Sequence, residues 1–126
     1  SHLCESLAAG GWTVRVLDDL STGLVDNLSH ISPAPVLIEG CVTDAGAVAR
    51  AVAGCGVVFH LAALASVAKS VEDPLASHAD CATGALNVLD AARRAGVRRV
   101  VYAGSASAYG NASAPEGQDE GTPLMA

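Results

Sequence analysis

The sequence predicts an α/β protein built around a parallel sheet with helices on both faces. Short apolar runs typical of buried strands alternate along the chain with longer segments whose apolar residues recur at helical spacing. Glycine and proline mark most of the boundaries between these segments. Strands that alternate with helices pair in parallel, because each helix carries the chain back across the sheet before the next strand begins.

The first helix and the first strand are expected near the amino end of the chain. Residues 1–9 form an apolar helical segment, and Gly10–Gly11 end it, because glycine adopts the backbone conformations that helix ends require. The β-rich run at residues 13–17 predicts a strand. Residues 18–35 are loop-like, with one turn of helix expected at residues 24–28.

The middle of the chain repeats this alternation of strand and helix. The apolar run at residues 36–39 predicts a second strand, and a helix is expected over residues 45–53. Thr43–Asp44 caps the amino end of this helix, and Gly54 stops it. A third strand is expected at residues 57–61.

A long helix is expected over residues 74–95. Asp73 supplies its N-cap, Pro74 takes the first helical position, where proline is tolerated, and Gly96 closes the helix. Apolar side chains recur at helical spacing along it, at Leu75, Ala79, Ala82, Leu86 and Leu89. Its face of small residues predicts close packing in the core, and the alternative is a subunit contact in a homodimer.

A fourth strand is expected at residues 97–103, and residues 111–126 are expected to form an exposed loop. The length fits about one domain. The chain begins inside a helix with no strand before it and stops in a polar loop. We therefore expect residues 1–126 to be an internal piece of a larger α/β protein.

The composition excludes several classes of partner and location. The net charge is −6 and the basic residues are scattered, so no nucleic-acid partner is expected. No apolar run approaches the ~18 residues that span a bilayer, and no signal peptide opens the chain. We therefore expect a cytoplasmic protein that does not bind membranes.

The cysteines lack the paired spacing of a metal site or of a disulfide framework. There are four of them, Cys4, Cys41, Cys55 and Cys81. We expect reduced, buried thiols rather than disulfides, as in other cytoplasmic proteins, and no bound metal.

A carboxylate follows the first predicted strand, at Asp18. An acidic residue at the end of such a strand presents a carboxylate to the two ribose hydroxyls of an adenosine. This contact favours NAD over NADP, because a 2′-phosphate would meet a like charge. An aspartate after a strand is more often a turn residue, so the position of Asp18 relative to other motifs is what favours the ribose contact.

Small hydroxyl residues follow the fourth predicted strand, in the run Gly104-Ser105-Ala106-Ser107. In open α/β sheets, ligands bind beyond the carboxyl ends of the strands. A serine at this place can hydrogen-bond a reacting hydroxyl. Taken alone, Ser105 is interpreted as a hydroxyl that caps the end of a strand.

Four segments, taken in order, resemble the extended short-chain dehydrogenases/reductases of the NAD-dependent epimerase/dehydratase family. The segments are SHLCESLAAGGWTVRVLDDLSTG, VVFHLAALASVAKSVEDP, TGALNVLDAARRAGVRRVVYAGSASAYG and the acidic loop from Pro115 to Pro123. Sugar-nucleotide epimerases of the UDP-glucose 4-epimerase type are the most similar. The resemblance implies a partial NAD-binding Rossmann domain over residues 1–126, without the substrate domain.

The resemblance also implies roles for individual residues. Ser105 would be catalytic, Asp18 would bind the adenine ribose, and Ser66 would lie at the substrate edge. The other residues expected to line the NAD site are Asp19, Leu20, Val42, Leu61, Ala62, Ala63, Leu64, Ala103 and Gly104. Without the resemblance, residues 61–64 would be a strand end in the core. His60 is interpreted as a core histidine and Lys69 as a solvated charge.

The chain departs from the family pattern at several positions. Neither a glycine-rich phosphate loop nor a Tyr-x-x-x-Lys pair occurs in it, so donors for the pyrophosphate and the catalytic base are missing. Cys41 and Cys81 replace an Asp and an Asn that the family often has, and thiols are poor substitutes for both groups.

The sequence therefore predicts part of an NAD-dependent enzyme that acts on a nucleotide sugar by transient hydride transfer to NAD. A 4-epimerase is favoured over a dehydratase, because no acidic residue stands in the Ser105-Ala106-Ser107 run. We expect the 126-residue polypeptide itself to be inactive. The alternatives are a reductase or dehydratase of the same superfamily and a non-catalytic Rossmann-like module.

Overall fold

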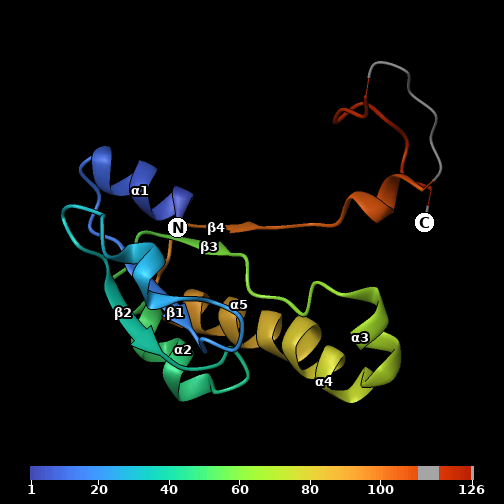
Figure 1. Cartoon of the computed structure of the whole chain (residues 1–126), viewed down its shortest axis with the longest axis horizontal. Coiled ribbons are helices and arrows are strands. Elements are labelled where there is room, and N and C mark those ends of the chain that lie inside the picture. Colours follow the sequence, from blue (N-terminus) through green and yellow to red (C-terminus); the bar gives the residue numbers. More distant parts are fainter. Residues whose placement is uncertain (111–116, 126) are drawn as a thin grey trace.

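The computed structural model describes residues 1–110 and 117–125 and contains four short strands in two parallel pairs (Figure 1). β1 (Arg15–Asp18) pairs with β2 (Val36–Glu39), and β3 (Val57–His60) pairs with β4 (Arg99–Tyr102). Among the described residues, no ladder joins one pair to the other. The α/β class and all four predicted strands are confirmed, with the bounds of β2 unchanged and those of the other strands shifted by at most two residues.

The helices and helical turns follow the predicted order, with two additions at residues 67–72 and 106–109. The α-helices are α1 (His2–Ala9), α2 (Ala45–Val52), α3 (Val67–Glu72), α4 (Pro74–His78) and α5 (Gly84–Arg94). The shorter turns are η1 (Val25–Leu28) and η3 (Ala106–Tyr109), both 3-10, and the π-helical η2 (Ala79–Thr83). In the part of the chain that the structure describes, no helix is long and apolar enough to cross a membrane.

Side-chain caps explain where three of the helices begin. Asp44 Oδ1 accepts hydrogen bonds from the N–H groups of Gly46 and Ala47, at 2.8 and 3.2 Å, and so starts α2. Asp73 caps α4 in the same way, as predicted. Ser66 caps α3, which the sequence did not predict, because that short helix is largely exposed and has no buried apolar stripe.

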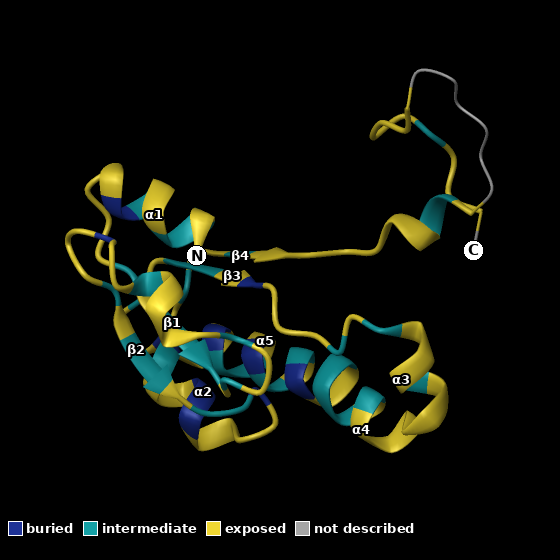
Figure 2. Cartoon of the chain, viewed as in Figure 1, coloured by how far each residue is buried: buried dark blue, intermediate teal, exposed yellow. Residues whose placement is uncertain are grey.

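The core lies between α2 and α5 and consists of Val42, Val48, Val52 and Val88. Val48 is only 1% exposed. Leu17 of β1 and Val58 of β3 pack against the same cluster, so one helix layer supports both strand pairs. Figure 2 shows the buried residues gathered in α2 and α5, and Figure 1 shows α1 on the other side of the strands.

The predicted long helix exists, but its leucines do not face the core. Leu75, Leu86 and Leu89 are 81%, 66% and 50% exposed, whereas the buried face of α5 carries Gly84, Val88 and Ala92. Small residues occupy the buried face because α5 approaches the loop after β2 closely. The predicted close packing of small residues is therefore confirmed, and the leucine stripe lies on the outer face instead.

The segment after β4 leaves the sheet as an extended chain and leads to η3, away from α2 and α5 (Figure 1). Residues 117–125 are largely exposed, as predicted for this loop, and the Met125 N–H donates to the Ala108 carbonyl at 2.9 Å. The rest of the predicted loop, residues 111–116 and 126, lies outside the described residues. All four cysteines are free thiols, as predicted, although each is only half-buried.

Arg15 joins β1 to the carboxyl end of α2. Its Nη1 lies 3.2, 3.0 and 2.8 Å from the carbonyl oxygens of Arg50, Ala51 and Ala53. The last carbonyls of a helix have no partner within the helix, and the helix dipole makes this end negative. The guanidinium therefore supplies both the missing donors and the favourable charge.

Replacing this guanidinium is expected to lower stability. For Arg15→Met, we expect the free energy of unfolding to fall by about 1 kcal/mol, because charge-assisted hydrogen bonds are lost at a partly solvated site. Urea unfolding measures the change. The matched control is Arg99→Met, since Arg99 also begins a strand, is exposed and makes no side-chain hydrogen bond to the described residues. Equal losses for the two variants would contradict this role of Arg15.

Candidate active site

The predicted site residues follow the carboxyl ends of the strands. Parallel pairing places Asp18 and the loop 40–43 at one end of the β1–β2 pair. It likewise places residues 61–64 and 103–105 at one end of the β3–β4 pair. Backbone bonds continue each ladder beyond the strands, from Gly40 N–H to Asp18 O at 3.0 Å and from Ala103 N–H to His60 O at 3.1 Å.

Asp18 ends β1 beside a small pocket of about 160 Å³. Its half-buried carboxylate accepts a hydrogen bond from the Leu20 N–H through Oδ1, at 2.8 Å. Leu20 has a φ of +58°, which residues other than glycine rarely adopt. It lines the pocket together with Cys4 of α1 and Ser1, which precedes that helix. A Cβ on Gly23 would lie 3.2 Å from Oδ1, so glycine lets the loop pass close to the carboxylate.

The side chain of Asp19, the second acidic residue, does not line the pocket beside Asp18. Asp19 is exposed, and its Oδ1 accepts hydrogen bonds from the Ser21 hydroxyl at 2.7 Å and the Ser21 N–H at 3.0 Å. These bonds lower the pKa of the Asp19 carboxyl, with the hydroxyl contributing most. The role of Asp19 in an adenosine site stays a prediction.

Val42 lies in the loop between β2 and α2, and its side chain belongs to the valine core, with 8% of the residue exposed. A ligand can therefore meet this residue only through its backbone or the small exposed remainder of its side chain. The neighbouring Cys41 thiol is half-buried and donates to Asp80 Oδ1 at 3.8 Å. The sequence did not indicate this contact.

The segment after β3 is exposed. Leu61 is 59% exposed, Ala62 and Ala63 are exposed, and Leu64 is half-buried. The alternative interpretation of residues 61–64 as core is therefore wrong. Small and exposed residues here leave the backbone open to a ligand.

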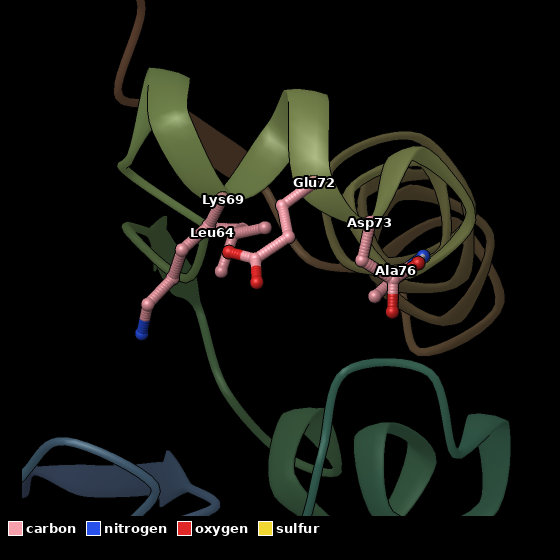
Figure 3. A pocket seen from close by; sticks show the side chains of 5 residues that line it. All are labelled: Leu64, Lys69, Glu72, Asp73 and Ala76. Carbon is pink, nitrogen blue, oxygen red and sulfur yellow. Dashed lines mark hydrogen bonds between the residues drawn. The ribbon is translucent and has the colours of Figure 1, made fainter.

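Leu64 also lines a wide, open pocket of about 450 Å³ beneath α3. Figure 3 shows the side chains of Lys69 and Glu72 extending from α3 into this space, with Asp73 and Ala76 at its side. The pocket is therefore rimmed by charged groups of both signs. Lys69, which the sequence suggested as a solvated charge, is exposed and faces the pocket.

His60 ends β3 and is buried, with 5% of the residue exposed, as its interpretation as a core histidine predicts. Its ring lies 5.4 Å from the Tyr102 ring, centroid to centroid, and tilted by 54°. Burial lowers the pKa of His60, so the ring is neutral at neutral pH. Its Nε2 has no hydrogen-bond partner among the described residues, so the histidine is buried but not satisfied there.

The two serines of the predicted site both cap helical turns. Ser105 is exposed at the start of η3, and its Oγ accepts a hydrogen bond from the Ser107 N–H at 3.1 Å. Ser66 Oγ accepts from the Lys69 N–H at 3.3 Å. An accepted bond fixes each hydroxyl oxygen and leaves its proton available as a donor. Ala103 and Gly104, just before Ser105, are exposed.

The sequence profile of the NAD dependent epimerase/dehydratase family matches residues 1–126. The chain belongs to this family. It is 38% identical, over 124 residues, to a UDP-glucose 4-epimerase of Mycolicibacterium smegmatis, and the match covers 94% of this chain and 40% of that protein. The chain thus spans about 40% of the length of this relative.

Solved structures of the same family have the same fold. A UDP-glucose 4-epimerase of Thermus thermophilus, in complex with NAD, matches 98% of this chain and 40% of that one, with a TM-score of 0.85 and 35% identity. A dTDP-glucose 4,6-dehydratase of Streptomyces venezuelae, with NAD bound, matches 98% and 41%, with a TM-score of 0.83 and 29% identity. The chain therefore has an incomplete Rossmann-like fold of the epimerase/dehydratase type.

The arrangement suits the adenosine end of NAD better than the pyrophosphate. Asp18 Oδ2 accepts no hydrogen bond from the described residues, so one carboxylate oxygen at the pocket is available to ribose hydroxyls. The printed sequence contains no glycine-rich run that offers several backbone donors to a phosphate. The segment after β4, which carries Ser105, lies apart from the β1–β2 pair (Figure 1).

Sequence reasoning missed two residues that shape this region, Asn87 and Gly84. Both lie on α5 and contact the loop between β2 and α2. The sequence did carry a signal for these two residues. Asparagine and glycine are weak helix formers, so their presence inside a predicted helix indicates that a specific contact requires them.

Proposed function

We propose that this chain is the cofactor-binding part of an NAD-dependent 4-epimerase that acts on a nucleotide sugar. The observation that carries the proposal is the placement of Asp18, with one free carboxylate oxygen, at a pocket beyond the end of β1. A carboxylate at that place suits the two hydroxyls of an unphosphorylated adenosine ribose. The 38% identity to a UDP-glucose 4-epimerase supports the sugar-nucleotide substrate.

In this proposal, the chain's own residues bind the ends of the cofactor and orient the sugar. Asp18 holds the adenine ribose, with Asp19 and Leu20 beside it, and the backbone at Val42 lies by the adenine. The exposed segment 61–64 and Ala103–Gly104 lie along the rest of the cofactor, with Ser66 at the substrate edge. Small side chains at most of these positions would allow the cofactor to approach the backbone closely.

Ser105 is the catalytic hydroxyl in this proposal, because it can donate a hydrogen bond to the oxygen of the sugar hydroxyl that is oxidised. Bound NAD would supply the acceptor for the hydride that leaves the sugar carbon, and the hydroxyl proton would pass to a base. The printed sequence holds no Tyr-x-x-x-Lys pair to serve as that base. We therefore propose that residues 1–126 alone do not catalyse the reaction.

A 4,6-dehydratase is the second candidate function, because the dehydratase of Streptomyces venezuelae has the same fold over 98% of this chain. Dehydration requires an acid and a base beside the sugar, and no acidic residue stands in the Ser105-Ala106-Ser107 run. This favours the epimerase. A non-catalytic module is the third candidate and predicts no turnover by the protein in any form.

The nucleotide sugar is the proposed substrate, and a second copy of the protein is the proposed partner. The outer faces of α3, α4 and α5 offer apolar side chains for such a homodimer. The most exposed are Val67, Val71, Leu75 and Leu86, at 82%, 78%, 81% and 66%. Apolar side chains gathered in this way are typical of interaction surfaces.

The activity assay tests the proposed reaction. We expect the protein expressed from its complete gene to interconvert UDP-glucose and UDP-galactose with NAD, without net consumption of NAD. The polypeptide of residues 1–126 serves as the inactive control. A strict requirement for NADPH, or formation of a 4-keto-6-deoxy sugar, would reject the epimerase.

Asp18→Asn tests the cofactor site. We expect NAD to bind about tenfold more weakly, because a charged acceptor of ribose hydrogen bonds becomes a neutral one. The affinity ratio of NADP to NAD should rise, because a 2′-phosphate no longer meets a like charge. Calorimetric titration of the complete protein measures both.

The matched control for this experiment is Asp26→Asn, which removes an exposed carboxylate from η1. The control should bind both cofactors as the unsubstituted protein does. Unchanged NAD affinity in Asp18→Asn, or an equal loss in Asp26→Asn, would place the ribose elsewhere.

A further inference from the structure

Asn87 of α5 holds the loop that follows β2. Its side-chain Nδ2 donates hydrogen bonds to two successive carbonyl oxygens, those of Val42 at 3.0 Å and Thr43 at 3.2 Å. Because both partners are acceptors, only the amide nitrogen of the side chain can face them. One half-buried side chain therefore fixes two consecutive peptide groups, 44 and 45 residues away along the sequence.

Gly84 lies one turn before Asn87, on the same face of α5, and makes this contact possible. It is buried, and a Cβ built on it would lie 2.5 Å from Val42 Cγ2, closer than side chains ever approach. Residues three apart on a helix lie on the same face. Gly84 thus lets α5 approach Val42, and Asn87 then reaches the two carbonyls.

The loop is also fixed from the side of α2. The Asp44 N–H donates to the Cys41 carbonyl at 3.0 Å, and the Asp44 side chain caps α2. Val42 itself is anchored by its side chain in the valine core. Since that side chain is occupied by packing, the shape of the loop, rather than a mobile side chain, determines what Val42 presents to a ligand.

We propose that Asn87 is a positioning residue, which together with Gly84 fixes the 41–43 loop in the shape that receives the adenine end of the cofactor. The proposal rests on the cofactor site proposed above. It assigns to α5 a part in cofactor affinity, although Asn87 does not itself touch the cofactor.

Asn87→Ala and Asn87→Asp test the proposal. In the ligand-free protein, we expect amide hydrogens of residues 41–47 to exchange about tenfold faster in Asn87→Ala, because two hydrogen bonds to the loop are lost. The β3–β4 amides should keep their protection. NAD should bind about three- to tenfold more weakly to the same variant in calorimetric titration.

Asn87→Asp adds a readout that a general loss of packing would not change. At pH 7.5 its carboxylate faces two carbonyl oxygens, so exchange in residues 41–47 should be faster than in Asn87→Ala at the same pH. Near pH 4 a protonated carboxyl regains one donor, so the difference between the two variants should shrink or reverse. The matched control is Arg93→Ala, at an exposed position of α5 where Arg94 still pairs with Asp90, and it should change neither exchange nor affinity.

Three results would overturn the proposal. They are unchanged exchange of residues 41–47 in both Asn87 variants, an equal rise of exchange in β3–β4, and faster loop exchange with unchanged NAD affinity. If the unsubstituted protein itself does not bind NAD, the proposed cofactor site fails. The exchange data on the ligand-free variants still decide whether Asn87 holds the loop.

Discussion

Val48 of α2 and Val88 of α5 lie at the centre of the contact between these helices, 1% and 4% exposed. The two strand pairs share no ladder in the described residues, and the helix layer contacts both of them. Leu17 of β1 and Val58 of β3 reach the same valine cluster from the two pairs. Within the described residues, apolar packing against two helices therefore links Asp18 to residues 61–64, the two parts of the proposed cofactor site.

The site itself divides into parts that act through side chains and parts that act through the backbone. Asp18 offers a carboxylate oxygen, and Ser105 offers a hydroxyl proton. The loop around Val42 and the exposed segment 61–64 contribute mainly shape, because their side chains are packed in the core or small. Such a shape is only as well defined as the contacts that support it, and we therefore propose that the contacts of α5 with the loop affect cofactor affinity.

The strands and the helix caps at Asp44 and Asp73 were predictable because each depends on local chemistry. The β-rich run before Asp18, and Asp73 followed by Pro74, carry their signal within a few residues. Contacts between distant elements were not predictable in this way. The outward leucines accompany the close approach of the opposite face of α5 to Val42, and the amide bonds of Asn87 reach a loop 44 and 45 residues away. The resemblance to the epimerase/dehydratase family supplied the cofactor and the reaction class, which spacing alone did not.

We propose that the α2–α5 contact joins the two strand pairs into one cofactor site. The decisive measurement is amide exchange of the complete protein with and without saturating NAD. We expect NAD to protect residues 18–20, 41–43 and 61–64 together, with one dissociation constant for all three segments. Protection confined to the segments of one strand pair, or a different dissociation constant for each pair, would contradict it.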